Sequence, residues 1–173
     1  MVKPENPFSP QLPSEKDLET VAAQLGRTPR GVIEVANRCS CGKPTVVATK
    51  PALADGEPFP THFYLTCANL NSMIGTLEAS GLMKEYEERL STDKEFAEQY
   101  KKAHIDYLDR RNKHGLVDEI TEISAGGMPN RVKCLHALVA HSLAVGPGIN
   151  PVGDDALVRL GNWATKACVK ESE

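Results

Sequence analysis

The sequence predicts an α+β fold in which a small, mainly antiparallel sheet of about three strands packs against four to five helices. Short β-rich runs separated by Gly/Pro turns occupy the first part of the chain. Apolar residues then recur at helical spacing over much of the remainder. The chain has 173 residues, of which 40% are hydrophobic and only 5% aromatic, which fits a single domain with an aliphatic core.

We expect one globular domain over residues 14–167, between flexible tails at 1–13 and 168–173. The N-terminal tail is rich in proline and polar residues and lacks the apolar segment of a signal peptide. No apolar run approaches the roughly 18 residues of a transmembrane helix. With a formal net charge of −3 and no basic patch, the sequence gives no indication of a nucleic-acid partner. We therefore expect a cytoplasmic protein of bacterial type.

The first elements are a helix followed by two strands. Ser14 and Asp17 form the pattern of a capping box, and apolar residues follow at helical spacing until Gly26. β-rich runs at 32–36 and 45–49 lie on either side of a Gly/Pro turn. This arrangement predicts a pair of strands.

A third strand and a second helix are expected to meet at Cys67. Residues 62–67 alternate, so that Phe63, Leu65 and Cys67 share one face of the strand. From Ala68 to about Ser80 the apolar residues follow a period of 3.6, which predicts a helix that ends at Gly81.

The segment 82–114 is dense with charges of both signs and predicts a solvated helix packed on the core. Within this segment, Thr92 and Glu95 resemble a capping box. One apolar stripe faces inward and consists of Phe96, Tyr100, Ala103 and Tyr107. The alternative is that the charged helix at 92–113 is the contact surface for a protein partner.

Two further helices are expected after the flexible Gly126–Gly127 segment. Residues 130–141 predict a largely buried helix that Asn130 caps. A turn-rich connection then leads to a last short helix around residues 154–163.

The cysteines are the main candidates for a functional site. Five cysteines are too few and too scattered for the disulfide framework of a secreted protein, so we expect reduced thiols. Cys39, Cys67 and Cys134 each lie beside a turn or an element boundary, and a compact fold can bring them together. These three residues and His136 are the predicted metal ligands, with His141 and Cys41 as alternatives. Cys168, on the terminal helix, is expected to lie outside the site.

Helix geometry makes the two histidines competitors. In a regular helix Cys134 and His141 share a face, whereas His136 points roughly 200° away from Cys134. Both histidines cannot join one site unless Cys134 precedes the regular helix. The plainer interpretation is that each histidine is satisfied by a carbonyl group, and that the cysteines are separate, small buried residues.

Two kinds of chemistry fit this cluster. Arg131, Lys133 and the start of a helix favour the thiolate form of Cys134. Three or four thiolates with an imidazole would suit zinc or an iron–sulfur cluster. Alternatively, the chain is a thiol-dependent enzyme with Cys134 as nucleophile and His136 or His141 as base. The sequence identifies no carboxylate or amide that would orient that base, so whether the protein is an enzyme stays open.

Four segments in this order resemble the bacterial family known as domain of unknown function 501 (DUF501), which is common in actinobacteria. They are RCSCGKP at 38–44, PFPTHFYLTC at 58–67, GGMPNRVKCLH at 126–136 and NPVG at 150–153. The resemblance spans about residues 26–165. It implies that Cys39, Cys67, Cys134 and His136 belong to the signature segments of the family, and that the residue at Cys41 varies.

The resemblance implies no activity for the chain. Members are often encoded near a septum-formation initiator, an enolase and an exopolyphosphatase. An interaction protein of the division machinery is therefore an alternative function, with a protein partner and oligomeric state that the resemblance leaves open.

Overall fold

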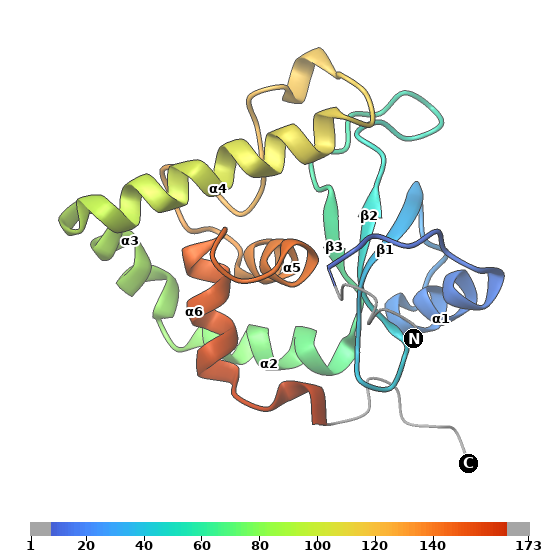
Figure 1. Ribbon diagram of the computed structural model, residues 1–173, viewed down its shortest axis with the longest axis horizontal. Coiled ribbons are helices and arrows are strands. Elements are labelled where there is room, and N and C mark those ends of the chain that lie inside the picture. Colours follow the sequence, from blue (N-terminus) through green and yellow to red (C-terminus); the bar gives the residue numbers. More distant parts are fainter. Residues whose placement is uncertain (1–7, 166–173) are drawn as a thin grey trace, which may run out of the picture.

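The fold is a three-stranded antiparallel sheet surrounded by helices (Figure 1). The computed structural model describes residues 8–165. Within this range the strands, in the order β1–β2–β3, are β1 (Val32–Arg38), β2 (Pro44–Thr49) and β3 (Phe63–Leu65). The helices are α1 (Glu15–Leu25), α2 (Ala68–Ala79), α3 (Leu82–Thr92), α4 (Lys94–Asn112), α5 (Leu135–Val145) and α6 (Pro151–Leu160), with 3-10 helices at Asp118–Ile120 and Trp163–Thr165. The predicted α+β class with a small antiparallel sheet is confirmed.

Helix α1 lies on one side of the sheet and α5 on the other (Figure 1). The predicted capping box at Ser14 and Asp17 starts α1, and Gly26, with a φ of 70°, ends it. Arg38 at the end of β1 binds both carboxylate oxygens of Asp17, at 2.7 and 2.9 Å. This paired contact connects the helix to the sheet.

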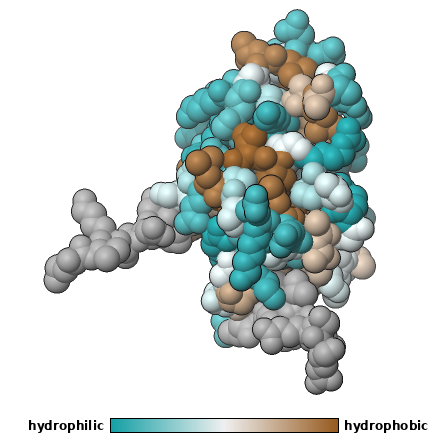
Figure 2. All heavy atoms as spheres, turned by 90° about the vertical axis from the view of Figure 1, so that its right-hand side faces the viewer, coloured by the Kyte–Doolittle hydropathy of each residue, from teal (hydrophilic) through white to brown (hydrophobic). Residues whose placement is uncertain are grey.

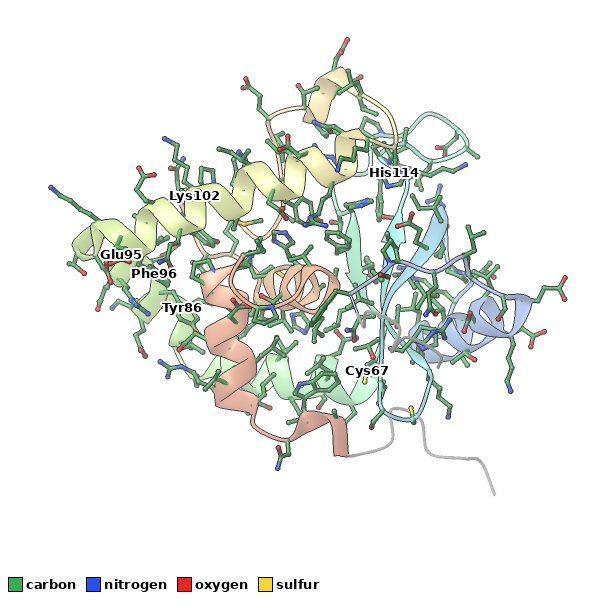
Figure 3. All side chains as sticks on the ribbon, in the orientation of Figure 1. Cys67, Tyr86, Glu95, Phe96, Lys102 and His114 are labelled. Carbon is green, nitrogen blue, oxygen red and sulfur yellow. The ribbon has the colours of Figure 1, made fainter. Side chains whose placement is uncertain are left out.

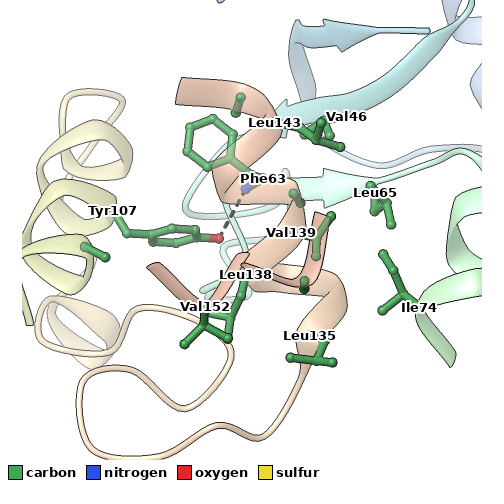
Figure 4. Packing of buried hydrophobic residues seen from close by; sticks show 14 of the residues in the cluster. Val46, Phe63, Leu65, Ile74, Tyr107, Leu135, Leu138, Val139, Leu143 and Val152 are labelled. Atoms are coloured by element: carbon green, nitrogen blue, oxygen red, sulfur yellow. Dashed lines mark hydrogen bonds between the residues drawn. The ribbon is translucent and has the colours of Figure 1, made fainter. Parts of the chain in front are cut away.

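Helix α5 is the centre of the core. It packs against all three strands, α2 and α6. Because apolar residues surround its axis, it has no polar face and is buried on nearly all sides. Figure 4 shows side chains of β2, β3, α2, α4 and α6 converging on it. The residues labelled there are Val46, Phe63, Leu65, Ile74, Tyr107, Leu135, Leu138, Val139, Leu143 and Val152.

The charged segment forms two helices, and the residue that caps the second differs from the prediction. The side chain of Asp93 accepts the backbone N–H of Phe96, and its φ of −113° and ψ of 100° break the helix between α3 and α4. Thr92 is instead the last residue of α3. The predicted apolar stripe of α4 is buried on the core: Phe96, Tyr100, Ala103 and Tyr107. A partner for its charged outer face stays a prediction.

Helix α5 begins at Leu135, later than the predicted range of 130–141. Gly126 and Gly127 have positive φ angles of 64° and 93°, and their carbonyl groups accept the N–H groups of Lys133 and Arg131. The chain is thereby held in a compact turn as far as residue 133. Cys134, with a φ of −150°, is the N-cap in place of Asn130.

Helix α6, in contrast, starts earlier than predicted, because Asn150 caps it through the N–H of Gly153 and Pro151 occupies its first turn. Residues 1–7 and 166–173, which include Cys168 and most of the two predicted tails, lie outside the described residues. Gln11, within the range of the first predicted tail, pairs with Val35 of β1. Among residues 8–165, no helix has both the length and the apolar composition needed to cross a membrane.

Candidate metal and thiol site

The candidate site forms where the start of α5 meets the end of α2. Cys134 is extended, one residue ahead of the regular helix, so its side chain does not follow the helical register of His136. A carboxylate oxygen of Glu78, the sulfur of Cys134 and a ring nitrogen of His136 all lie within 4.8 Å of one another. The condition under which Cys134 and His136 can share a site is therefore met.

Glu78 belongs to the last turn of α2 and is the only charged residue of that helix. A carboxylate at this end of a helix is disfavoured by the helix dipole. Its Oε1 atom accepts the N–H of Leu135, in the first turn of α5, at 2.8 Å. The positive end of α5 thus compensates for the unfavourable position of Glu78 on α2.

His136 lies between two oxygen atoms. Its Nδ1 is 3.1 Å from Oε1 of Glu78, and its Nε2 is 3.1 Å from the carbonyl oxygen of Asn71. The neighbouring Cys134 sulfur, followed by the Asn71 carbonyl and Glu78, raises the pKa of His136 to about 9, against the opposing effect of burial. These contacts thus favour the protonated form of His136.

The same contacts act on Cys134 in the opposite direction. His136 lowers the pKa of the Cys134 thiol, and the backbone N–H of Ala137 acts in the same sense, whereas burial and Glu78 oppose them. The site therefore favours the thiolate, the form that binds metals and attacks electrophiles.

A cavity of about 270 Å³ opens onto the site. Its walls come from the edge strand β3, the start of α5, Asn71 of α2 and Leu25 of α1. Cys134 and His136 both line it and are both partly accessible. A small molecule in this cavity would contact the sulfur of Cys134 directly.

Cys67 and Cys39 do not belong to the three-residue group found among the described residues. Cys67 is the buried N-cap of α2, where its sulfur accepts the N–H of Leu70 at 3.5 Å (Figure 3). Cys39 is buried after β1, with its sulfur 3.8 Å from the Ser40 hydroxyl. Cys41 is exposed in the turn that follows. Of the four ligands predicted, the structure brings together Cys134 and His136.

His141 is engaged elsewhere, in a buried polar network. Its Nδ1 accepts the side-chain N–H of Asn150 at 3.1 Å, so its Nε2–H donates to Asp106 at 2.8 Å. Burial lowers the pKa of His141, although Asp106 opposes this. His141 thus connects α5 to α4 and to the cap of α6, and is not a member of the Cys134 group.

Sequence reasoning missed Glu78 and Asn71. Glu78 supplies the carboxylate that a base would need, and the backbone of Asn71 fixes the other side of the His136 ring. One sequence signal could have identified Glu78, because it is a single charge at the disfavoured end of an otherwise uncharged helix. The role of Asn71 depends on its backbone carbonyl, which carries no sequence signal.

Comparison with known proteins identifies the family. Searches of curated proteins and of solved structures gave no match. Residues 35–158, which include Cys39, Cys67, Glu78, Cys134 and His136, match the family described as "Protein of unknown function (DUF501)". Since this match covers most of the chain, the protein belongs to the DUF501 family.

Proposed function

We propose that this protein binds one zinc ion through the sulfur of Cys134, a ring nitrogen of His136 and the carboxylate of Glu78. The observation that carries the proposal is the convergence of these three ligand atoms within 4.8 Å. Two ligands of one tetrahedral zinc lie roughly 3.5 Å apart, given bonds of about 2.0–2.3 Å. The 3.1 Å between Nδ1 of His136 and Oε1 of Glu78 is close to that spacing.

The surroundings of the three ligands support a metal site. Metal-bound histidines usually donate their second N–H to a carbonyl or carboxylate group, and Nε2 of His136 is placed to donate to the Asn71 carbonyl. The N–H of Leu135 holds Glu78 in the same way. Iron–sulfur clusters are held mainly by several cysteine thiolates. Because the group contains one cysteine, its donor set favours zinc over an iron–sulfur cluster.

Three protein ligands leave the fourth position of a tetrahedral zinc open, which is typical of catalytic rather than structural sites. The cavity beside Cys134 and His136 provides room for water or a small substrate at that position. Zinc in such a site activates water or polarises a carbonyl group. The proposed function is therefore that of a zinc-dependent enzyme acting on a small molecule.

Metal analysis of purified full-length protein tests the proposal. The wild type should contain one zinc per chain, and Cys134→Ser, His136→Gln or Glu78→Gln should each weaken zinc binding by about 100-fold or more. The controls Cys41→Ser and Glu88→Gln change exposed residues of the same types and should retain the metal. A wild type that binds no zinc, or site variants that bind it like the controls, would contradict the proposal.

A second candidate is a thiol-dependent enzyme, which one observation specifically favours. Glu78 contacts Nδ1 of His136 and can orient the ring, and a ring nitrogen of His136 lies within 4.8 Å of the Cys134 sulfur. This candidate predicts that iodoacetamide alkylates Cys134 faster than the more exposed Cys41 in protein that never contained metal. His136→Gln should then slow the alkylation of Cys134 and leave that of Cys41 unchanged. Alkylation of Cys134 at the rate of Cys41 would contradict it.

A further inference from the structure

A second cavity lies directly beside the first. It has a volume of about 230 Å³, and Leu25 and Tyr64 line both cavities. Ligand pockets usually measure about 300–1,000 Å³, so neither cavity alone reaches this range, but the two joined do. Because they share Leu25 and Tyr64, the two cavities adjoin, and we refer to the pair as the cleft.

The open edge of the sheet explains how the two cavities can adjoin. β3 is the edge strand, and Tyr64 pairs with Val47, so both side chains point to the side of the sheet that carries α1. Phe63 and Leu65 point to the opposite side, towards α5. All three residues of β3 line the first cavity. The two cavities therefore lie at this edge, one beside Cys134 and the other on the α1 side.

The second half of the cleft is mainly apolar. Figure 2 shows hydrophobic residues gathered in the middle of the side of the molecule that carries α1. The apolar residues that line this half are Leu25, Pro29, Val32, Val47, Leu53 and Phe59. An aliphatic or aromatic body would be removed from water here.

The two arginines at this end of the cleft differ in their partners. Arg30 is paired with Asp55 at 3.3 Å and with Glu57 at 3.9 Å. Arg27 donates to the neutral hydroxyl of Tyr64 at 3.2 Å and lies 5.9 Å from the centre of its ring. No ion pair within residues 8–165 includes Arg27. Within the described part of the chain, the charge of Arg27 thus has no acidic partner beside Tyr64, the residue that lines both halves of the cleft.

We infer that the joined cleft binds a small molecule with an apolar body and an anionic end group. Arg27 pairs with the anion, Leu25 and Tyr64 contact the body, and the opposite end reaches Cys134 and His136. Guanidinium groups bind carboxylate and phosphate oxygens alike through paired hydrogen bonds. The inference rests on the proposed function, because that function places the reacting end of the molecule at Cys134 and His136. It does not depend on the presence of zinc.

Alkylation of Cys134 by two series of maleimides, matched in spacer length but different in end group, tests this inference. Metal-free, full-length protein is treated with N-alkylmaleimides with spacers from ethyl to decyl, in one series ending in a carboxylate and in another ending in a neutral amide. Peptide mass spectrometry follows the rate at Cys134 separately from the other cysteines. At one spacer length the carboxylate should react about two- to fivefold faster than the amide, which is the effect of a single accessible ion pair.

Variants of the two arginines identify the group responsible. Arg27→Gln should abolish the preference for the carboxylate, whereas Arg27→Lys and Arg30→Gln should retain it. Equal rates for the two series at every length, a preference that survives in Arg27→Gln, or no alkylation of Cys134 by any reagent would overturn the inference.

The zinc content of the same preparations, measured before metal removal, separates the two proposals. A carboxylate preference in protein that binds no zinc contradicts only the zinc site. Zinc binding without the preference contradicts only the anion-binding cleft.

Discussion

At the scale of single residues, the site depends on the backbone of Cys134. Its extended φ and ψ angles place it ahead of the first helical residue, and this lets its sulfur approach the ring of His136. If Cys134 were itself a residue of the regular helix, its side chain and that of His136 would point in nearly opposite directions. The turn built on Gly126 and Gly127 delays the start of α5 and so makes the cluster possible.

A buried histidine outside the site gives a pH-dependent test of the fold. His62 is 2% exposed, and its Nδ1 is 2.9 Å from the carbonyl oxygen of Thr49. Burial, followed by the charges of His114, Arg111 and His141, lowers the pKa of His62 from 6.5 to about 4, although the Thr49 carbonyl opposes this. Between these two pH values the unfolded chain takes up a proton that the folded protein does not.

We therefore expect the free energy of unfolding to fall as the pH is lowered from 6.5 to about 4. The contribution of His62 to this fall is at most about 1.4 kcal/mol per pH unit. His62→Asn keeps a donor for Thr49 but does not titrate, so its stability should depend less on pH in this window. Urea denaturation of both proteins across the window checks this, and a comparison at pH 8 gives the cost of the substitution itself. Parallel curves for the two proteins would rule out a neutral, buried His62.

Residue patterns predicted some of the site and not the rest. Cys134 and His136 could be proposed from the sequence because both stand in one short segment near an expected helix start. Glu78 is more than 50 residues away, and only the packing of α2 against α5 brings its carboxylate to His136. Such a contact has no local periodicity, so no pattern in either segment could have predicted it.

At the scale of the elements, the contact between α5 and α6 is unusually close. A Cβ atom at Gly153, in the first turn of α6, would overlap the carbonyl oxygen of Leu138 and the hydroxyl of Ser142 on α5. Gly75 in α2 has no such neighbour within 4 Å of the position that a Cβ atom would take. The two glycines are therefore a matched pair for testing helix packing.

Replacement of these two glycines by alanine should change stability in opposite directions. Gly153→Ala should lower the free energy of unfolding by roughly 1–3 kcal/mol or more, because α6 must move away from α5. Gly75→Ala should raise it by about 0.5–1 kcal/mol, because alanine favours a helix and restricts the unfolded chain. Urea denaturation measures both values. A Gly153→Ala variant as stable as the wild type would contradict the close packing of the two helices.

Element boundaries were less predictable than element types. The periodicity of the apolar residues correctly predicted α1, α2 and the buried stripe of α4. The predicted starts of α4 and α5 were wrong, because tertiary contacts and turn geometry determine which of several possible residues caps a helix. Asp93 caps α4 in place of Thr92, and Cys134 caps α5 in place of Asn130.

At the scale of the whole molecule, one buried helix organises both the core and the site. The middle of α5 contacts the sheet, α2 and α6, and its first residues contribute to the cluster with Glu78. Strand alternation and helix periodicity predicted the α+β class, because both reflect which side of an element is buried. They could not predict the cleft around β3, because its shape depends on how α1 and α5 are placed on opposite sides of the sheet.

The zinc K-edge X-ray absorption spectrum of the full-length protein tests the central claim most directly. We predict one sulfur at about 2.3 Å from the metal and nitrogen or oxygen atoms at about 2.0–2.2 Å, from Cys134, His136, Glu78 and one water or substrate atom. In Cys134→Ser the sulfur contribution should disappear. A first shell with three or four sulfurs, or protein that takes up no zinc, would contradict a centre built from these three residues.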